Sequence, residues 1–183
     1  MGFPGRSAPE VADLYENGQS ERADSLLVDY YRERAHAISE ELTAYYPNRT
    51  TILHKAFRMH NERERDISVP LFLIQADGIC IHAFRREFFR IKKGALAARK
   101  SVDNANVDWI WNALTEPFRI ALPIATHTRG VEFLNRRRIL HGQSLTYGTE
   151  INSLKAISLL AFLHGLDRYR EEYKRQSVGL DTR

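Results

Sequence analysis

Residues 135–142 read NRRRILHG, which places an arginine at Arg136 and a histidine at His141. A histidine accepts or donates a proton near neutral pH, and an arginine binds phosphate and stabilises negative charge that develops on it. Together the two side chains could cleave RNA without a metal ion. The base would remove a proton from the 2′-hydroxyl, and the freed oxygen would attack the adjacent phosphate.

The spacing of this pair is weak evidence by itself. In a chain with 21 arginines and 7 histidines, roughly two pairs with such a spacing are expected by chance, and two are present. Arg49 and His54 begin a predicted helix whose apolar neighbours indicate core packing. Arg136 and His141 instead end a segment that Gly142 and a polar loop follow, where side chains can reach a ligand.

The surrounding sequence distinguishes the second pair further. Residues 134–163, LNRRRILHGQSLTYGTEINSLKAISLLAFL, resemble the HEPN superfamily (higher eukaryotes and prokaryotes nucleotide-binding). The signature of that superfamily is an arginine, a polar residue, several further residues and a histidine. Residues 69–80, VPLFLIQADGIC, weakly resemble helices of uncharacterised bacterial members. The two stretches cover roughly the last third and the centre of the chain.

This resemblance implies a homodimeric helical bundle that acts as a metal-independent endoribonuclease, as many members do in toxin–antitoxin, CRISPR-associated or phage-defence systems. The expected products carry 2′,3′-cyclic phosphate and 5′-hydroxyl ends. The resemblance makes Arg136 the phosphate-binding group and His141 the acid/base group. RNA and a second copy are the implied partners, together with an antitoxin or sensor protein. Neither a cofactor nor a metal is expected. The other candidates are RNA-binding Arg137 and Arg138 and the supporting residues Asn135, Asp77 and Tyr147.

Arg137 departs from the family pattern, because the position after the first arginine is usually Asn, Asp or His. An arginine cannot accept a hydrogen bond as those side chains can. An alternative therefore stays open: a non-catalytic module that binds RNA, a nucleotide or a protein partner. A helical interaction domain without any nucleic-acid role is a third reading. Gln143 replaces the tyrosine of one toxin branch, whereas Tyr147 lies further along and could approach the site.

Helix geometry separates the two principal residues. Five residues place Arg136 and His141 about 140° apart around an ideal α-helix. They can share one site only if Gly142 loosens the last turn or if a second copy completes the site. The resemblance implies the second solution, with both copies lining one cleft.

Asp77 stands in the apolar stretch LFLIQADGIC, where an unpaired carboxylate would be costly to bury. It either orients Arg136 or the imidazole of His141, or it forms a structural ion pair or hydrogen bond. Gly78 is expected to permit a close approach of another helix at the same level.

Composition is typical of one globular domain of 183 residues, with 43% hydrophobic and 27% charged residues and a net charge of +4. The preference for Arg over Lys suits phosphate or carboxylate recognition. The single cysteine, Cys80, is expected to be a small core residue in a reducing cytoplasm. Neither a secretion signal nor a segment of membrane-spanning length is evident.

Helical periodicity predicts an all-α, single-domain bundle of about five to seven helices over residues 1–183. An N-terminal arm with a short helix (1–19) and a charged, fraying tail (168–183) flank it. Ser68 is expected to cap the central helix and Pro70 to lie in its first turn. Trp109 and Trp111 either stack on bases or pack in the core. The longer helices are expected at about 20–46, 50–62, 69–90 and 128–141, and then from a cap at Thr149 through 151–166.

Overall fold

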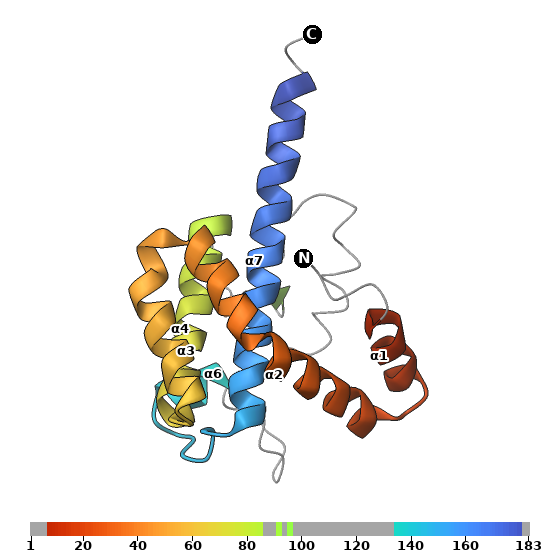
Figure 1. The fold of residues 1–183 in the computed structure, drawn as a ribbon, viewed down its shortest axis with the longest axis vertical. Helices are drawn as coiled ribbons and strands as arrows, with labels where there is room; N and C mark the ends of the chain where they lie inside the picture. Colours follow the sequence, from red (N-terminus) through yellow and green to blue (C-terminus); the bar gives the residue numbers. More distant parts are fainter. Residues whose placement is uncertain (1–6, 86–90, 93–94, 97–133, 181–183) are drawn as a thin grey trace.

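The computed structural model describes residues 7–85, 91–92, 95–96 and 134–180. It confirms an all-α, single-domain fold (Figure 1). The helices of the described ranges are α1 (Ser7–Glu16), α2 (Ser20–Tyr45), the 3-10 helix η1 (Pro47–Arg49), α3 (Thr50–Asn61), α4 (Arg65–Phe84), α6 (Arg136–Leu140) and α7 (Glu150–Leu180). Two two-residue strands, β1 (Ile91–Lys92) and β2 (Ala95–Leu96), pair antiparallel.

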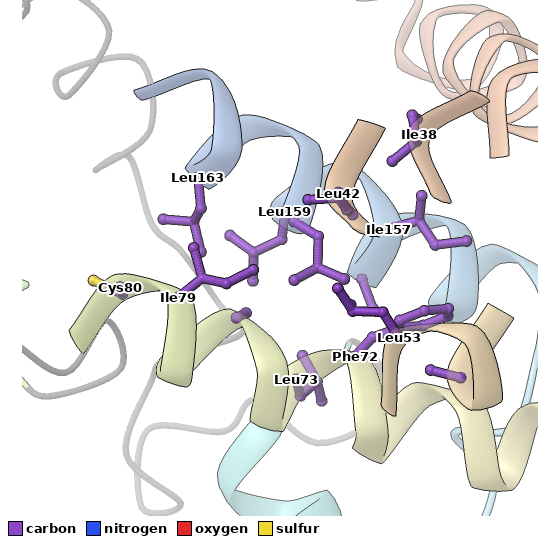
Figure 2. Close-up of a cluster of buried hydrophobic side chains, with 14 of the residues drawn as sticks. Ile38, Leu42, Leu53, Phe72, Leu73, Ile79, Cys80, Ile157, Leu159 and Leu163 are labelled. Atoms are coloured by element: carbon purple, nitrogen blue, oxygen red, sulfur yellow. The ribbon is translucent and has the colours of Figure 1, made fainter. Parts of the chain in front are cut away.

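The core lies where α4 packs against α3 and α7, with α2 packed against the same two helices. Apolar side chains at helical spacing account for this arrangement, since each helix turns one such face inward. Phe57 and Phe72 meet edge to face, with ring centroids 4.9 Å apart. Figure 2 shows the centre of the cluster, which includes Leu42, Leu53, Phe72, Ile79, Ile157 and Leu163.

The central helix α4 differs from its predicted form at both ends. It begins at Arg65, so Ser68 is not its cap but a buried residue whose hydroxyl lies 3.1 Å from that of Ser153. Pro70 accordingly falls in the second turn. The helix ends at Phe84 because Arg85 adopts a left-handed backbone conformation (φ 55°), well before the expected end at Arg90.

By length and composition α4 could cross a membrane, contrary to the prediction that no segment has membrane-spanning length. Over half of its most apolar window (56%) is nevertheless buried inside the fold. Cys80 is fully buried in this helix, which confirms it as a core residue. Burial, and secondarily the charge of Asp77, raises the pKa of its thiol to about 12, so the thiol is protonated at neutral pH.

The expectation of a fraying tail from residue 168 is wrong, because α7 continues to Leu180. Pairs with helical spacing support this extension, including Arg168 with Glu172 and Asp167 with Arg170. Figure 1 shows α7 running through the bundle and projecting beyond it. Trp109, Trp111 and the expected start of a helix at residue 128 lie outside the described residues.

Candidate functional site

The stretch NRRRILHG forms a short helix with a defined start. Leu134 and Asn135 are not helical, so α6 begins at Arg136 and the predicted helix over 128–141 is wrong at these two residues. Asn135 has an extended backbone, and its buried side chain accepts a hydrogen bond from the backbone N–H of Arg138 at 3.0 Å. Asn135 is thus the N-cap of α6, a structural role that satisfies one free donor of the first turn.

The other end of α6 is closed by a Schellman motif. Gly142 has a φ of +68°, a left-handed conformation that glycine adopts without steric cost. The Gln143 N–H bonds the Arg138 carbonyl at 2.7 Å, and the Gly142 N–H bonds the Ile139 carbonyl at 3.0 Å. The prediction that Gly142 ends this helix is confirmed. Both ends of the five-residue helix are therefore fixed by its own sequence.

Asp77 and Arg136 attach α6 to the central helix. The Arg136 guanidinium lies 2.5 Å from the Asp77 carboxylate, and the two side chains are 31% and 14% exposed. Ile139 of α6 is buried in the core cluster, and α6 packs against α4. Of the partners considered for Asp77, the structure places Arg136 beside it. An ion pair of this kind can be structural or can orient the arginine for a ligand.

His141 lies at the C-cap of α6, where its side chain is exposed. It forms neither a side-chain hydrogen bond nor an ion pair with the described residues, Arg136 included. Arg137 is exposed and Arg138 half-buried. One copy of the chain therefore turns Arg136 toward α4 and leaves Arg137 and His141 available to a ligand.

Tyr147 does not join the contact between Asp77 and Arg136. Its hydroxyl donates a hydrogen bond to the Asp66 carbonyl at 3.0 Å, at the beginning of α4. Pro70 has no backbone N–H, so the Asp66 carbonyl lacks its ordinary helical donor. Eleven residues separate Asp66 from Asp77, or about 16 Å along the helix axis. Tyr147 thus holds the loop after α6 against the start of α4.

The predicted cap of α7 is confirmed in the same loop. The Thr149 hydroxyl oxygen accepts a hydrogen bond from the Asn152 N–H at 3.2 Å. The Asn152 side chain in turn donates to the Tyr147 carbonyl at 3.0 Å. These contacts connect the segment that follows His141 to both α4 and α7.

Arg49, which belongs to the other Arg–His pair, is also bound to α4. Its guanidinium donates to the side-chain oxygen of Gln75 at 3.0 Å and to the Gly78 carbonyl at 2.7 Å. Burial lowers the pKa of Arg49, although Tyr46 opposes that effect. Gly78 was expected to permit the close approach of another helix, but the Arg49 guanidinium fills that space. His54, the other member of the pair, is exposed. The structure supports a packing role for Arg49.

Two buried polar clusters were not foreseen. In one, the His60 Nδ1 atom lies 2.7 Å from the Ser153 hydroxyl, which also meets Ser68. In the other, the Tyr46 hydroxyl donates to Asp167 at 3.1 Å. The pairs lie 93 and 121 residues apart, so the only available signal was the presence of polar residues within apolar helices. These hydrogen bonds join core segments that are distant in the sequence and satisfy the hydroxyls of Tyr46 and Ser153.

Burial also shifts the ionisation of two histidines in these regions. It lowers the pKa of His60, with a further lowering by Arg65 that Glu150 opposes. It likewise lowers the pKa of His164, where Arg168 adds to the effect. Both histidines are therefore held neutral by the fold.

Comparison of the chain with protein-family models, with curated proteins and with solved structures found no match. The arrangement around α6 combines a guanidinium held in place, two further arginines and an imidazole open to solvent. These groups can bind a phosphate, stabilise charge on it and transfer a proton. They are the chemical components of phosphodiester recognition or cleavage.

Proposed function

We propose that this chain is a homodimeric, metal-independent endoribonuclease of the HEPN type. The observation that carries the proposal is the fixed position of α6, which is capped at both ends and bound to α4 through Arg136 and Asp77 at 2.5 Å. A group held in place binds a developing charge without reorganisation, which is the main source of electrostatic catalysis. The exposed His141 on the same short helix supplies the proton-transfer group.

In this mechanism His141 in its neutral form removes the proton from the 2′-hydroxyl of RNA. The 2′-oxygen forms a bond to the adjacent phosphorus while the bond from phosphorus to the 5′-oxygen breaks. Arg136 stabilises the negative charge on the phosphoryl oxygens, and the 5′-oxygen leaves with a proton from a protonated imidazole or water. The products carry a 2′,3′-cyclic phosphate and a 5′-hydroxyl, so RNA is cleaved whereas DNA is not.

The site needs two copies of the chain, because Arg136 is turned toward α4 and His141 toward solvent. In the dimer His141 of one copy serves a phosphate held by Arg136 of the other. Arg137 and Arg138 add cations that bind the RNA backbone. We place such an enzyme in the bacterial cytoplasm, in a toxin or phage-defence setting, where an antitoxin or sensor protein would restrain it.

The second candidate is a binding module that recognises RNA without cutting it. The observation that favours it is Arg137, an exposed cation at the position where the family has a hydrogen-bond acceptor. In that case substitution of Arg136 and Arg137 reduces RNA binding, whereas substitution of His141 leaves RNA binding nearly unchanged.

The test is incubation of the purified protein with a mixed RNA pool in EDTA, beside His141→Ala. The proposal expects cleavage by the wild type alone, with cyclic phosphate ends. His54→Ala is the matched control, since His54 belongs to the other Arg–His pair and is also exposed. RNA that is bound but left intact by the folded wild-type dimer would support the binding module instead.

A further inference from the structure

Three isoleucines of α4 form an exposed apolar stripe on an otherwise central helix. Ile67, Ile74 and Ile81 are 47%, 46% and 45% exposed. Residues seven apart drift by only about 20° around an α-helix, so these side chains line one side of α4 from its first turn to its last. A helix that is apolar on nearly all sides is normally covered on all of them. The described part of the chain leaves this side uncovered.

The stripe adjoins the candidate site. Asp77, which holds Arg136, lies about 60° around α4 from Ile74. Gly78, which accepts the hydrogen bond of Arg49, lies about 40° from Ile74 in the opposite direction. α6 therefore borders the stripe on one side and η1 borders it on the other.

We infer that a second copy of this chain covers the stripe, with the two α4 helices antiparallel about a two-fold axis at Ile74. The inference rests on the proposed function, because it assigns the surface through which the two halves of that site meet. The equal spacing makes the stripe self-complementary, as an isologous interface requires. Ile74 of one copy faces Ile74 of the other copy, and Ile67 of each copy faces Ile81 of the other.

Charge favours the antiparallel direction. The exposed charged side chains at the start of α4 are Glu62, Arg63, Glu64 and Asp66, which carry a net charge of −2, and the exposed Arg85 follows its end. The half-buried Arg65 lies near Glu150. Antiparallel packing sets the acidic end of one helix against the basic end of the other, and it also opposes the two helix dipoles. Parallel packing would set like charges side by side.

The direction of packing also determines whether the two copies can share a site. A two-fold axis perpendicular to antiparallel helices keeps both α6 helices on the same face of the helix pair. The two Asp77 residues, each three positions from Ile74, would be offset by about 9 Å along the helices. A parallel pair would place the two α6 helices on opposite faces. Antiparallel packing therefore brings His141 of one copy toward Arg136 of the other, which a single copy does not achieve.

Disulfide trapping tests the arrangement. Facing helices packed about 8–10 Å apart bring facing Cα atoms within disulfide range. Ile74→Cys should give a covalent dimer under mild oxidation, which a reductant reverses. The unaltered chain is the blank, since its only cysteine, Cys80, is buried.

Ile67→Cys and Ile81→Cys are matched controls, because both lie on α4 with nearly the same exposure. In an antiparallel dimer, copies of either residue would lie about 21 Å apart, so neither variant should form a disulfide alone. The double variant should form one. Absence of a dimer from Ile74→Cys, or equal trapping of all three single variants, overturns the inference.

A second measurement guards against artefacts of oxidation. Ile74→Asp should convert the dimer to a folded monomer in analytical ultracentrifugation, whereas Thr51→Asp on the exposed surface of α3 should not. An Ile74→Asp protein that remains dimeric overturns the inference. So does a monomeric wild type, since another part of the chain would then cover the stripe.

Cleavage is measured separately from trapping, so the two proposals can fail independently. A trapped Ile74→Cys dimer that leaves RNA intact retains the interface and rejects the ribonuclease. RNA cleavage by a protein that gives no Ile74→Cys dimer retains the ribonuclease and rejects this interface.

Discussion

The guanidinium of Arg49 occupies the space that a β-carbon on Gly78 would fill. A β-carbon built there would lie 2.5 Å from the Arg49 Nη1 atom, so one of the two would have to move. Arg49 is restrained in that position by its hydrogen bonds to Gln75 and to the Gly78 carbonyl. The contact fixes η1, and with it the turn between α2 and α3, against the central helix.

Gly78→Ala should therefore destabilise the protein by about 1 kcal/mol, because loss of the Arg49 hydrogen bonds outweighs the gain in helix propensity. In an Arg49→Ala background the same change should stabilise it by roughly 0.5–1 kcal/mol. Denaturant unfolding of the four proteins gives both values. Gly165→Ala is the matched control in α7, where nothing lies within 4 Å of the added carbon, and it should be stabilising. A stabilising Gly78→Ala in the wild type would contradict the account.

Tyr147 and Pro70 should be coupled through the Asp66 carbonyl. Tyr147→Phe removes the donor of that carbonyl and should lower the free energy of unfolding by about 1 kcal/mol. Pro70→Ala restores a backbone N–H to the helix, so Tyr147→Phe should cost less in its presence. A double-mutant cycle by denaturant unfolding measures the difference. Strictly additive effects would show that Tyr147 does not substitute for the missing backbone donor.

The ion pair between Asp77 and Arg136 should contribute about 1–3 kcal/mol to stability, because both side chains are mostly buried. Asp77→Asn should remove most of that contribution, and Arg136→Met should remove little more once Asp77 is changed. Unfolding free energies of the single and double variants give the coupling. Asp66→Asn is the control, since Asp66 is an exposed carboxylate on the same helix. Equal losses from Asp66→Asn and Asp77→Asn would argue against the pair.

Stability should fall as the pH drops below the ordinary histidine value of about 6.5. The folded state lowers the pKa of both His60 and His164, mainly through burial. The unfolded chain then binds protons that the folded chain does not, so stability is retained above about pH 6.5 and lost as the pH falls through the folded-state values. Urea unfolding between pH 7.5 and 5.5 measures the slope.

His60→Gln and His164→Gln should each reduce this pH dependence, although either change also lowers stability at pH 7.5. His54→Gln is the control, because the side chain of His54 is exposed. An unchanged slope in both of the first two variants would contradict the assignment.

Sequence patterns predicted the features that depend on neighbouring residues. The helical period gave the all-α class, and the glycine after His141 marked the end of α6. Thr149 was predicted as the cap of α7, and the group that it binds lies only three residues away. These signals are local, because the groups that make each hydrogen bond lie within five residues of one another.

Features that depend on distant residues were missed or left open. Asn135 looked like part of a helix, although its side chain caps the next turn. The contact of Arg49 with Gly78 joins residues 29 apart, and that of Tyr147 with Asp66 joins residues 81 apart. A single sequence contains no pattern that pairs them. The partner of the Asp77 carboxylate was identified only from the packing of α6, which places Arg136 beside it.

In the proposed dimer, Arg136 of one copy and His141 of the other form one ribonuclease site. The most direct measurement uses a heterodimer of Arg136→Ala and His141→Ala chains, purified through two different tags and incubated with RNA in EDTA. One of its two sites is complete, so it should cleave at about half the wild-type rate while each parent homodimer is inactive. A heterodimer as inactive as its parents, beside an active wild type, would contradict the shared site, and an inactive wild-type dimer would contradict the ribonuclease itself.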